Sequence, residues 1–186
     1  MNLKRALETE GWLTEVEAQY LASIAYRYYL APFTANIVEV GSWKGRSTCA
    51  LASNVSVRVW AVDTWKGSAE HQPELSKHHP LWLYGEFLKN VEGLPVIPLM
   101  LPSLVAAKWL ERAGIQPDIV FIDANHDYES VKADILAWQP LLAPAGILCG
   151  HDYDPPHWMG VKQAVDECVP KFRIVPGTTI WSTEGA

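Results

Sequence analysis

The chain has 186 residues, a formal net charge of −6 and 49% hydrophobic residues. This length suits a single domain with a sizeable core. The acidic balance argues against a nucleic-acid partner, because a protein that reads phosphate backbones needs a basic face. No stretch approaches the roughly 20 apolar residues of a membrane span, and the first residues lack the apolar core of a signal peptide. We therefore expect a cytoplasmic protein without a membrane partner.

The three cysteines are scattered and include no Cys-x-x-Cys pair, which indicates free thiols rather than a zinc site or a disulfide framework.

The first predicted element is a helix that begins near residue 15. Thr14 and Glu17 fit a capping box, and apolar residues follow them at helical spacing through Tyr28. We expect residues 1–34 to form an N-terminal helical cap that lies over one edge of a sheet.

Residues 37–48 read Ile-Val-Glu-Val-Gly-Ser-Trp-Lys-Gly-Arg-Ser-Thr, which predicts a strand over 37–41, a turn with two glycines, and a helix over 46–53. Gly41 can take backbone angles closed to other residues, and Gly45 lets the chain pass close to a ligand. The spacing is Gly-x-x-x-Gly, so the Gly-x-Gly-x-x-Gly pattern that holds a dinucleotide is not present. An uncharged or zwitterionic cofactor is therefore favoured.

A second predicted strand, over 57–63, ends in Asp63. A carboxylate at this place in such a fold can accept both hydroxyls of a ribose. The alternative is that Asp63 only caps the next turn. Because Asp63 comes after the glycine turn, we favour the role in which it binds a ribose.

The rest of the chain alternates between apolar runs of strand length and helical patterns, with a long irregular stretch over 65–92. This alternation predicts an α/β fold with a doubly wound, mainly parallel sheet. The Pro176-Gly177 turn predicts a C-terminal hairpin that ends the sheet with antiparallel pairing. The predicted strands lie at 96–100, 118–123, 146–151, 172–175 and 178–182, and the helices at 103–113, 129–140 and 160–168.

Two further stretches carry a family resemblance. Residues 117–128 contain the pattern Ile-Asp-x-x-His-x-Tyr, and residues 141–148 lead into the fifth strand. In their order and spacing these motifs resemble the class I S-adenosylmethionine-dependent methyltransferases over about residues 35 to 182. They are most similar to the small-molecule O-methyltransferases that include macrolide-sugar enzymes.

The resemblance implies one methyltransferase domain over 1–186, with an S-adenosylmethionine-binding core over 35–186 and a substrate lid over 65–92. It also implies methyl transfer to a hydroxyl of a sugar or another polyhydroxylated small molecule. Cofactor contacts are expected at the carboxyl ends of the strands. They are Glu39, Gly41, Ser42, Gly45, Ser47, Asp63, Thr64, Trp65, Ser103, Asp123 and Ala124.

Asp123, His151 and Asp152 follow neighbouring strands and are the predicted ligands of a divalent cation, Mg²⁺ or Mn²⁺. In the metal-dependent relatives two carboxylates follow the fifth strand, and here the first is His151, which leaves the metal open. His126 is the predicted general base, with His151 as the second choice and Asp123 beside them. A merely structural role for His126, at the start of helix 129–140, is the alternative.

Specificity is expected to come from residues 65–92, whose adjacent His78 and His79 cannot face one metal. Residues 154–159 are either a second substrate wall, with Trp158 and Met159, or a rigid connection. The nine tryptophans exceed what one core needs, so some are candidates for a pocket or a homodimer interface.

Two other functional classes stay open from the sequence. One is an S-adenosylmethionine-binding sensor or inactive subunit, which retention of Asp123, His126 and Asp152 disfavours. The other is a nicotinamide-dependent oxidoreductase, which the glycine spacing disfavours.

Overall fold

The computed structural model describes residues 3–28, 34–53, 56–68 and 71–185. Residues 29–33, in the predicted N-terminal cap, and residues 69–70, in the predicted lid, lie outside the described residues. Among the described helices none is both long and apolar enough to cross a membrane.

A seven-stranded sheet in the order β3-β2-β1-β4-β5-β7-β6 forms the centre of the molecule. β1 pairs in parallel with both β2 and β4, so the strand order reverses at β1. The short β7 is antiparallel to β5 and β6 is antiparallel to β7. The predicted doubly wound sheet and C-terminal hairpin are therefore confirmed. The strands are β1 (Ala35–Val40), β2 (Val57–Asp63), β3 (Val96–Met100), β4 (Ile119–Ile122), β5 (Ile147–Gly150), β6 (Arg173–Ile174) and β7 (Trp181–Ser182).

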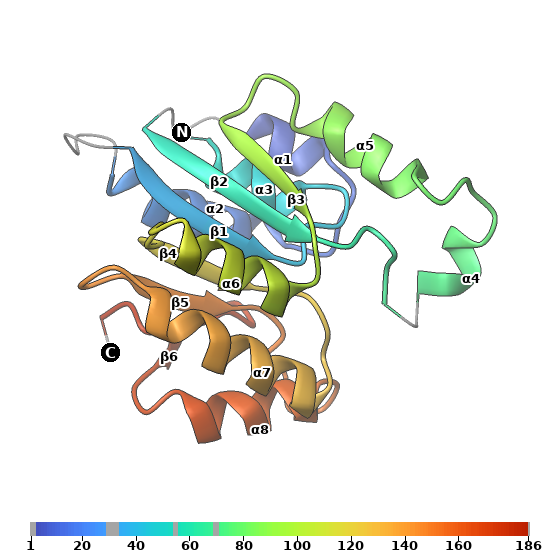
Figure 1. Cartoon of the computed structure of the whole chain (residues 1–186). Coiled ribbons are helices and arrows are strands. Elements are labelled where there is room, and N and C mark those ends of the chain that lie inside the picture. The colour runs from blue at the N-terminus through green and yellow to red at the C-terminus, as the bar shows by residue number, and fades with distance from the viewer. Residues whose placement is uncertain (1–2, 29–33, 54–55, 69–70, 186) are drawn as a thin grey trace.

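Helices cover both faces of the sheet, because its central strands are apolar on both sides. On the near face in Figure 1 lie α6 (Ser103–Arg112), α7 (Tyr128–Trp138) and α8 (Met159–Cys168), with a 3-10 turn over Gln139–Leu141. On the far face lie α1 (Lys4–Glu8), α2 (Glu15–Tyr26) and α3 (Arg46–Leu51).

Two expectations for the helices were wrong. Residues 65–92 are not irregular throughout: α4 (Gln72–Leu75) and α5 (Trp82–Asn90) form there, and α5 buries Leu83 and Phe87 at helical spacing. The capping box of α2 is present as predicted, but α2 packs on a face of the sheet rather than over its edge. Leu21 and Ile24 of α2 are apolar side chains that need to be buried, and the face of the sheet buries them.

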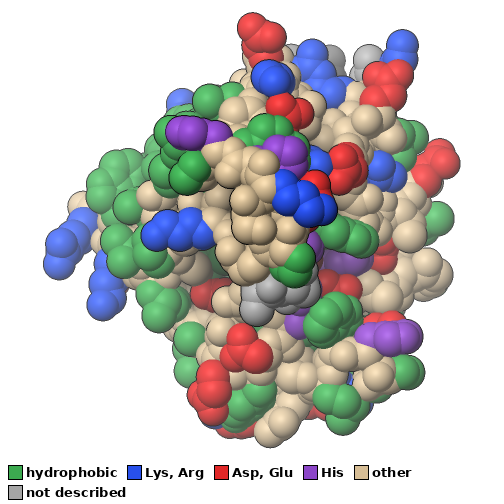
Figure 2. All heavy atoms as spheres, turned by 90° about the vertical axis from the view of Figure 1, so that its right-hand side faces the viewer, with side chains coloured by type: hydrophobic (Ala, Val, Ile, Leu, Met, Phe, Trp, Pro, Cys, Tyr) green, Lys and Arg blue, Asp and Glu red, His purple; other side chains and the backbone are tan. Residues whose placement is uncertain are grey.

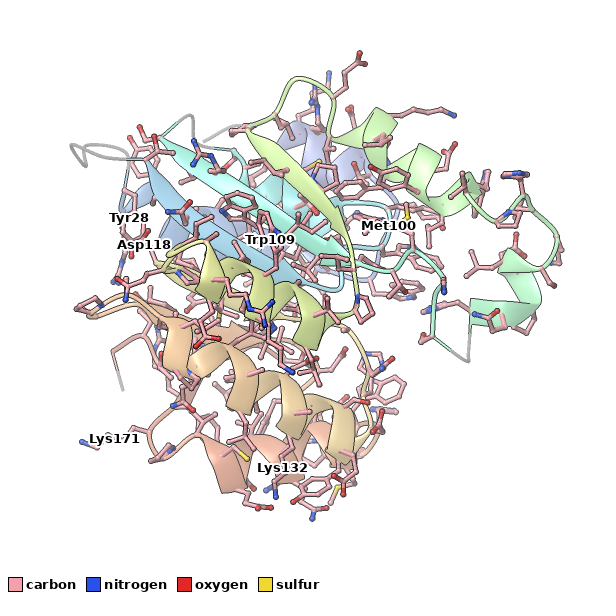
Figure 3. All side chains as sticks on the ribbon, in the orientation of Figure 1. Tyr28, Met100, Trp109, Asp118, Lys132 and Lys171 are labelled. Atoms are coloured by element: carbon pink, nitrogen blue, oxygen red, sulfur yellow. The ribbon has the colours of Figure 1, made fainter. Side chains whose placement is uncertain are left out.

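The parallel strands direct their carboxyl ends to one side, which is the right side of Figure 1 and the face shown in Figure 2. Figure 3 marks the two ends of the sheet. Tyr28 and Asp118 lie at the amino ends, where the Tyr28 hydroxyl donates to the Asp118 carbonyl at 3.5 Å, and Met100 ends β3 on the opposite side. Ligands of such sheets bind at the carboxyl ends.

Because β5 packs closely against the C-terminal hairpin, we predict opposite effects on stability when Gly150 and Gly85 are each replaced by alanine. A Cβ at Gly150 would lie 2.6 Å from the Trp181 ring and 2.7 Å from the Ile122 carbonyl oxygen, whereas a Cβ at Gly85, inside α5, would meet nothing within 4 Å. We expect Gly150→Ala to lower the free energy of unfolding by about 1–3 kcal/mol. Gly85→Ala should raise it by about 0.5–1 kcal/mol.

Urea unfolding of both variants, followed by circular dichroism, measures the two effects. Equal effects of the two substitutions would contradict the packing described for β5 and β7.

Candidate active site

A cavity of about 940 Å³ opens at the carboxyl ends of the parallel strands. Its walls come from the segments that follow β1 to β5, from the start of α7, and from residues 10–13 of the N-terminal segment. Histidine side chains are spread around this face of the molecule (Figure 2). Ligand pockets commonly measure about 300–1,000 Å³, so this cavity lies at the large end of that range.

The turn after β1 is pressed against the end of β4. Gly41 has a φ of 90°, and a Cβ there would lie 2.0 Å from the carbonyl oxygen of Asp123. Only glycine fits, because the backbone angle is left-handed and the space is filled by main chain. Gly41 and Asp123 are therefore held together at the floor of the cavity.

Asp63 holds the loops around it. Its Oδ2 accepts the backbone N–H groups of Ser42 at 2.8 Å and Trp43 at 2.9 Å, and its Oδ1 accepts the N–H of Trp65 at 2.7 Å. A carboxylate has about four acceptor positions, so one remains free of these backbone bonds. Asp63 lines the cavity as predicted, but it has room for about one ribose hydroxyl rather than two, and it also caps the turn.

Glu39 lies beneath the glycine turn and is fully buried. Its Oε2 accepts the hydroxyls of Ser42, at 2.7 Å, and Thr48, while its Oε1 has no hydrogen-bond partner among the described residues. Burial raises the pKa of Glu39 to about 7, although the nearby hydroxyls of Ser47, Thr48 and Ser42 act in the opposite direction. Glu39 therefore holds the glycine turn and the start of α3 in place through its hydrogen bonds with Ser42 and Thr48.

The structure separates the predicted cofactor residues into two groups. Three do not line the cavity, which corrects the prediction: Glu39 is beneath the turn, Gly45 faces Val91 and Phe87, and Trp65 is buried. The Trp65 indole donates to the Trp43 carbonyl at 3.0 Å, so Trp65 supports the turn. Those that line the cavity are Gly41, Ser42, Ser47, Asp63, Thr64, Ser103, Asp123 and Ala124.

A polar cluster lies where β4 and β5 end. One ligand-type atom from each of Asp123, His126 and Asp152 lies within 4.8 Å of the others. His126 Nε2 is 2.9 Å from Asp152 Oδ2, and the His126 ring stacks on Trp158 with centroids 4.1 Å apart. His126 thus has a fixed orientation and faces the cavity, as a general base requires. Asp152 itself has a φ of 61°, an uncommon backbone angle of the kind that often occurs at functional sites.

His151 lies beside this cluster, also lines the cavity, and meets three carboxylates. Its Nδ1 is 3.6 Å from Asp123 Oδ1 and 3.3 Å from Asp152 Oδ2, and its Nε2 is 3.1 Å from Glu17 Oε1. The contact with Glu17 is an ion pair whose geometry falls short of a hydrogen bond.

Burial lowers the pKa of His151, but the three carboxylates outweigh burial and raise it to about 12. Hydrogen bonds from His126 and His151 likewise hold the pKa of Asp152 below its ordinary value, against the effect of burial. The ligand-type atoms that lie within 4.8 Å of one another among the described residues belong to Asp123, His126 and Asp152, so His126 joins the candidate ligand set. The metal and base roles of His151 stay predictions.

Sequence reasoning missed the long-range role of Glu17. Besides capping α2, its Oε1 accepts the backbone N–H of Thr179 at 3.0 Å. Burial raises the pKa of Glu17, but His151 and the backbone bonds outweigh burial and lower it to about 2. The capping box identified Glu17 as a helix residue, and no sequence signal indicated its contact with His151.

An aromatic cluster at the cavity wall was also missed. The rings of Trp12, Trp43 and His71 lie 4.3–5.4 Å apart and come from three separate segments. Of the predicted lid, Gly67, Ser68 and His71 line the cavity. The aromatic Phe87, in contrast, packs on Trp65 in the core. The second predicted wall is present in part, since Trp158 lines the cavity and the exposed Met159 does not.

Comparison with known proteins identifies the family. A family model described as "Methyltransferase domain" matches residues 38–153, which is more than half of the chain. The chain belongs to the methyltransferase domain family. The predicted resemblance to class I S-adenosylmethionine-dependent methyltransferases is thereby confirmed.

The relatives of this methyltransferase domain are distant. The uncharacterized protein y4gI of Sinorhizobium fredii is 26% identical over 133 residues, and the match covers 68% of this chain but only 14% of that protein. The crystal structure of CalS11, a calicheamicin methyltransferase, has a TM-score of 0.65 at 18% identity and covers 91% of this chain and 80% of its own. An O-methyltransferase from Bacillus cereus in complex with SAH has a TM-score of 0.66 at 17% identity, with 97% and 89% covered. The structural likeness confirms the predicted methyltransferase fold.

The raised pKa of Glu39 predicts a pH-dependent cost to folding. The folded-state value of about 7 lies above the ordinary 4.5, so the folded methyltransferase domain loses stability as the pH rises from about 4.5 through 7. Glu39→Gln cannot ionise and keeps one acceptor oxygen for Ser42 and Thr48. The free energy of unfolding of this variant, relative to that of the wild type, should rise by up to about 3 kcal/mol between pH 4.5 and pH 8.

Urea unfolding at pH 5 and pH 8 measures this gain, with Glu92→Gln, an exposed glutamate after α5, as the matched control. A stability difference between variant and wild type that does not change with pH would refute the assignment.

Proposed function

We propose that this domain transfers the methyl group of S-adenosylmethionine to a hydroxyl of a small molecule, such as a sugar or a polyhydroxylated metabolite. The single observation that carries the proposal is the oriented His126. Its ring faces the large cavity at the carboxyl ends of the strands and is held by Asp152 at 2.9 Å.

The chain's residues fit the methyl donor. S-adenosylmethionine, when bound, supplies a methyl group on a positively charged sulfur. Ser42, Ser47, Thr64 and Ser103 offer hydroxyl or main-chain groups at the cavity wall, and Asp63 retains acceptor capacity for a ribose hydroxyl. We assign the donor to the part of the cavity between these residues and Gly41.

His126 is the proposed general base for the acceptor. Its imidazole would take the proton of the attacking hydroxyl, and Asp152 would stabilise the imidazolium that forms. Trp158, stacked on His126, limits the rotation of the ring and forms one wall for the acceptor. Because methyl transfer depends mainly on alignment, a rigid wall beside the base favours the reaction.

A sugar acceptor has support from one similar protein. CalS11 is described in a second structure as a TDP-rhamnose 3'-O-methyltransferase, and that structure has a TM-score of 0.61 at 19% identity. For this chain the sugar is a proposal, and the large cavity favours an acceptor of that size.

Assistance by a divalent cation is a second candidate mechanism, favoured by the spacing of Asp123, His126 and Asp152. These oxygen and nitrogen ligands suit Mn²⁺, and oxygen ligands alone suit Mg²⁺. The cation would lower the pKa of the acceptor hydroxyl. In that mechanism Asp123, His126 and Asp152 would hold the cation, and a group other than His126 would take the proton.

We further propose that the domain acts in the cytoplasm on a small-molecule acceptor, without a nucleic-acid or membrane partner, and that a homodimer is its form of association. The acidic net charge of −6 supports the exclusion of nucleic acid. A sensor that binds the cofactor without turnover, and a nicotinamide-dependent oxidoreductase, are the alternatives that the experiments below separate.

Replacement of His126 tests the proposed base. We expect His126→Gln to retain S-adenosylhomocysteine binding and to lose methyl transfer by about 100-fold or more, because general base catalysis contributes about 10²–10⁴-fold. Transfer of a radiolabelled methyl group to a panel of nucleotide sugars and polyhydroxylated metabolites provides the assay.

His157→Gln is the matched control, since His157 is an exposed histidine paired with Asp154 at 2.7 Å. Turnover that survives in His126→Gln would remove His126 as the base. The same assay after treatment with EDTA separates the two mechanisms: unchanged turnover supports the metal-free base, and turnover restored only by Mg²⁺ or Mn²⁺ supports the cation.

A further inference from the structure

A group of exposed apolar side chains lies at the end of β3 and along α6. Met100, Leu104, Val105 and Trp109 are each 43–50% exposed. Single exposed apolar residues are ordinary, but a group of them on one surface marks a site of interaction. Hydrophobic side chains gather on the left of Figure 2, the side of the near-face helices, and Figure 3 labels Met100 and Trp109. We call these four residues the α6 patch.

The α6 patch lies where the near-face layer of helices ends. α7 flanks α6 on one side, whereas on the other side β2 and β3 continue without a described helix over them (Figure 1). Trp109 packs there on the ring of Trp60, with centroids 6.0 Å apart. β3 is the edge strand of the sheet, and Pro98 in its middle has no backbone N–H, which disfavours the addition of another strand. The surface therefore suits a helix that packs through its side chains.

The charges on α6 are self-complementary. Lys108 and Glu111 are exposed and three positions apart, so they lie on the same side of the helix. Among the described residues they form no salt bridge with each other, whereas the exposed pair Lys89 and Glu86, at the same separation, does so at 2.7 Å. An antiparallel second copy of α6, centred between Lys108 and Glu111, places each lysine opposite the glutamate of the other copy. Two-fold symmetry then makes two ion pairs.

The other cations near the α6 patch fit the same arrangement. Arg112 is in the last turn of α6, and in the antiparallel arrangement it comes beside Trp109 of the second copy, whose ring face attracts a cation. Arg58 already lies over the Trp60 ring, 5.9 Å from its centroid. Neither cation is therefore left opposite a like charge alone.

We propose that the α6 patch is the contact surface of a homodimer, in which α6 packs antiparallel on the α6 of a second copy. The inference rests on the proposed homodimer and is independent of the proposed methyl transfer. The Trp109 rings of the two copies meet near the two-fold axis, and each Lys108 pairs with Glu111 of the other copy. Because Leu104 and Val105 also line the cavity, the two copies meet beside their cavity rims.

Sedimentation equilibrium of the whole chain over a series of concentrations tests the proposal. The wild type should form a dimer with a measurable dissociation constant. Lys108→Glu and Glu111→Lys should each weaken the dimer by about 10-fold or more, because each places two pairs of like charges opposite each other. The double variant restores both ion pairs with exchanged signs, so its dissociation constant should lie within about threefold of the wild-type value.

Trp109→Ala should weaken the dimer by about 30-fold or more, as expected for a central aromatic residue of an interface. This variant also loses the contact with Trp60, so circular dichroism must confirm its fold, and the exposed charge variants keep the test valid if it unfolds. Lys171→Glu is the matched control, because Lys171 is exposed and lies far from Trp109 (Figure 3). Its dissociation constant should equal that of the wild type.

A wild type that stays monomeric at every concentration would overturn the homodimer itself. A dimer that the folded single variants leave unchanged, or that the double variant fails to restore, would overturn this contact surface and leave a homodimer through another face. Neither result bears on methyl transfer, which the His126→Gln assay tests separately.

Discussion

The close approach of the turn after β1 to the end of β4 is the constraint on which the site depends. A side chain at Gly41 would collide with the Asp123 carbonyl at 2.0 Å, so the two chain segments touch as main chain. This contact places the glycine turn beside the residues that follow β4. Asp63 then fixes the same turn by accepting its N–H groups. The cavity floor is therefore rigid before any ligand binds, which lowers the entropic cost of aligning two reactants.

Buried charge is the second organising feature of the site. Glu17 belongs to α2 on the far face, yet its carboxylate reaches His151 at 3.1 Å and the hairpin at Thr179. His151 in turn lies between Asp123 and Asp152. Such a network is costly to bury, and removal of one partner leaves an uncompensated buried charge. It ties the N-terminal helix, whose preceding segment forms one cavity wall, to the residues proposed to act on the acceptor.

Local patterns predicted the fold well and the site in part. The strands, the capping box of Thr14 and Glu17, and the hairpin at Pro176-Gly177 follow from periodicity and turn chemistry, which act over a few residues. Helix α5 was missed because its helical signal, Leu83 and Phe87, lies in a stretch rich in proline and histidine, and its stability comes from packing on Trp65.

The individual site residues depend on tertiary geometry. Asp123, His151 and Asp152 were expected to converge because the ends of neighbouring parallel strands do so, and the structure brings His126 to the same place. Whether Glu39 faces a ligand or lies beneath the turn cannot be read from spacing, since Glu39 belongs to β1 and the side chain of a strand residue can point to either face of the sheet. The contact of His151 with Glu17 could not be read from the sequence, because the two residues are 134 positions apart in the chain.

The proposed methyl transfer requires that the cavity at the carboxyl ends of the strands bind S-adenosylmethionine. Calorimetric titration of the wild-type chain with S-adenosylhomocysteine and, separately, with NADH measures this binding. We expect saturable binding of S-adenosylhomocysteine at a single site and none of NADH. Binding of NADH, or no binding of S-adenosylhomocysteine, would contradict it.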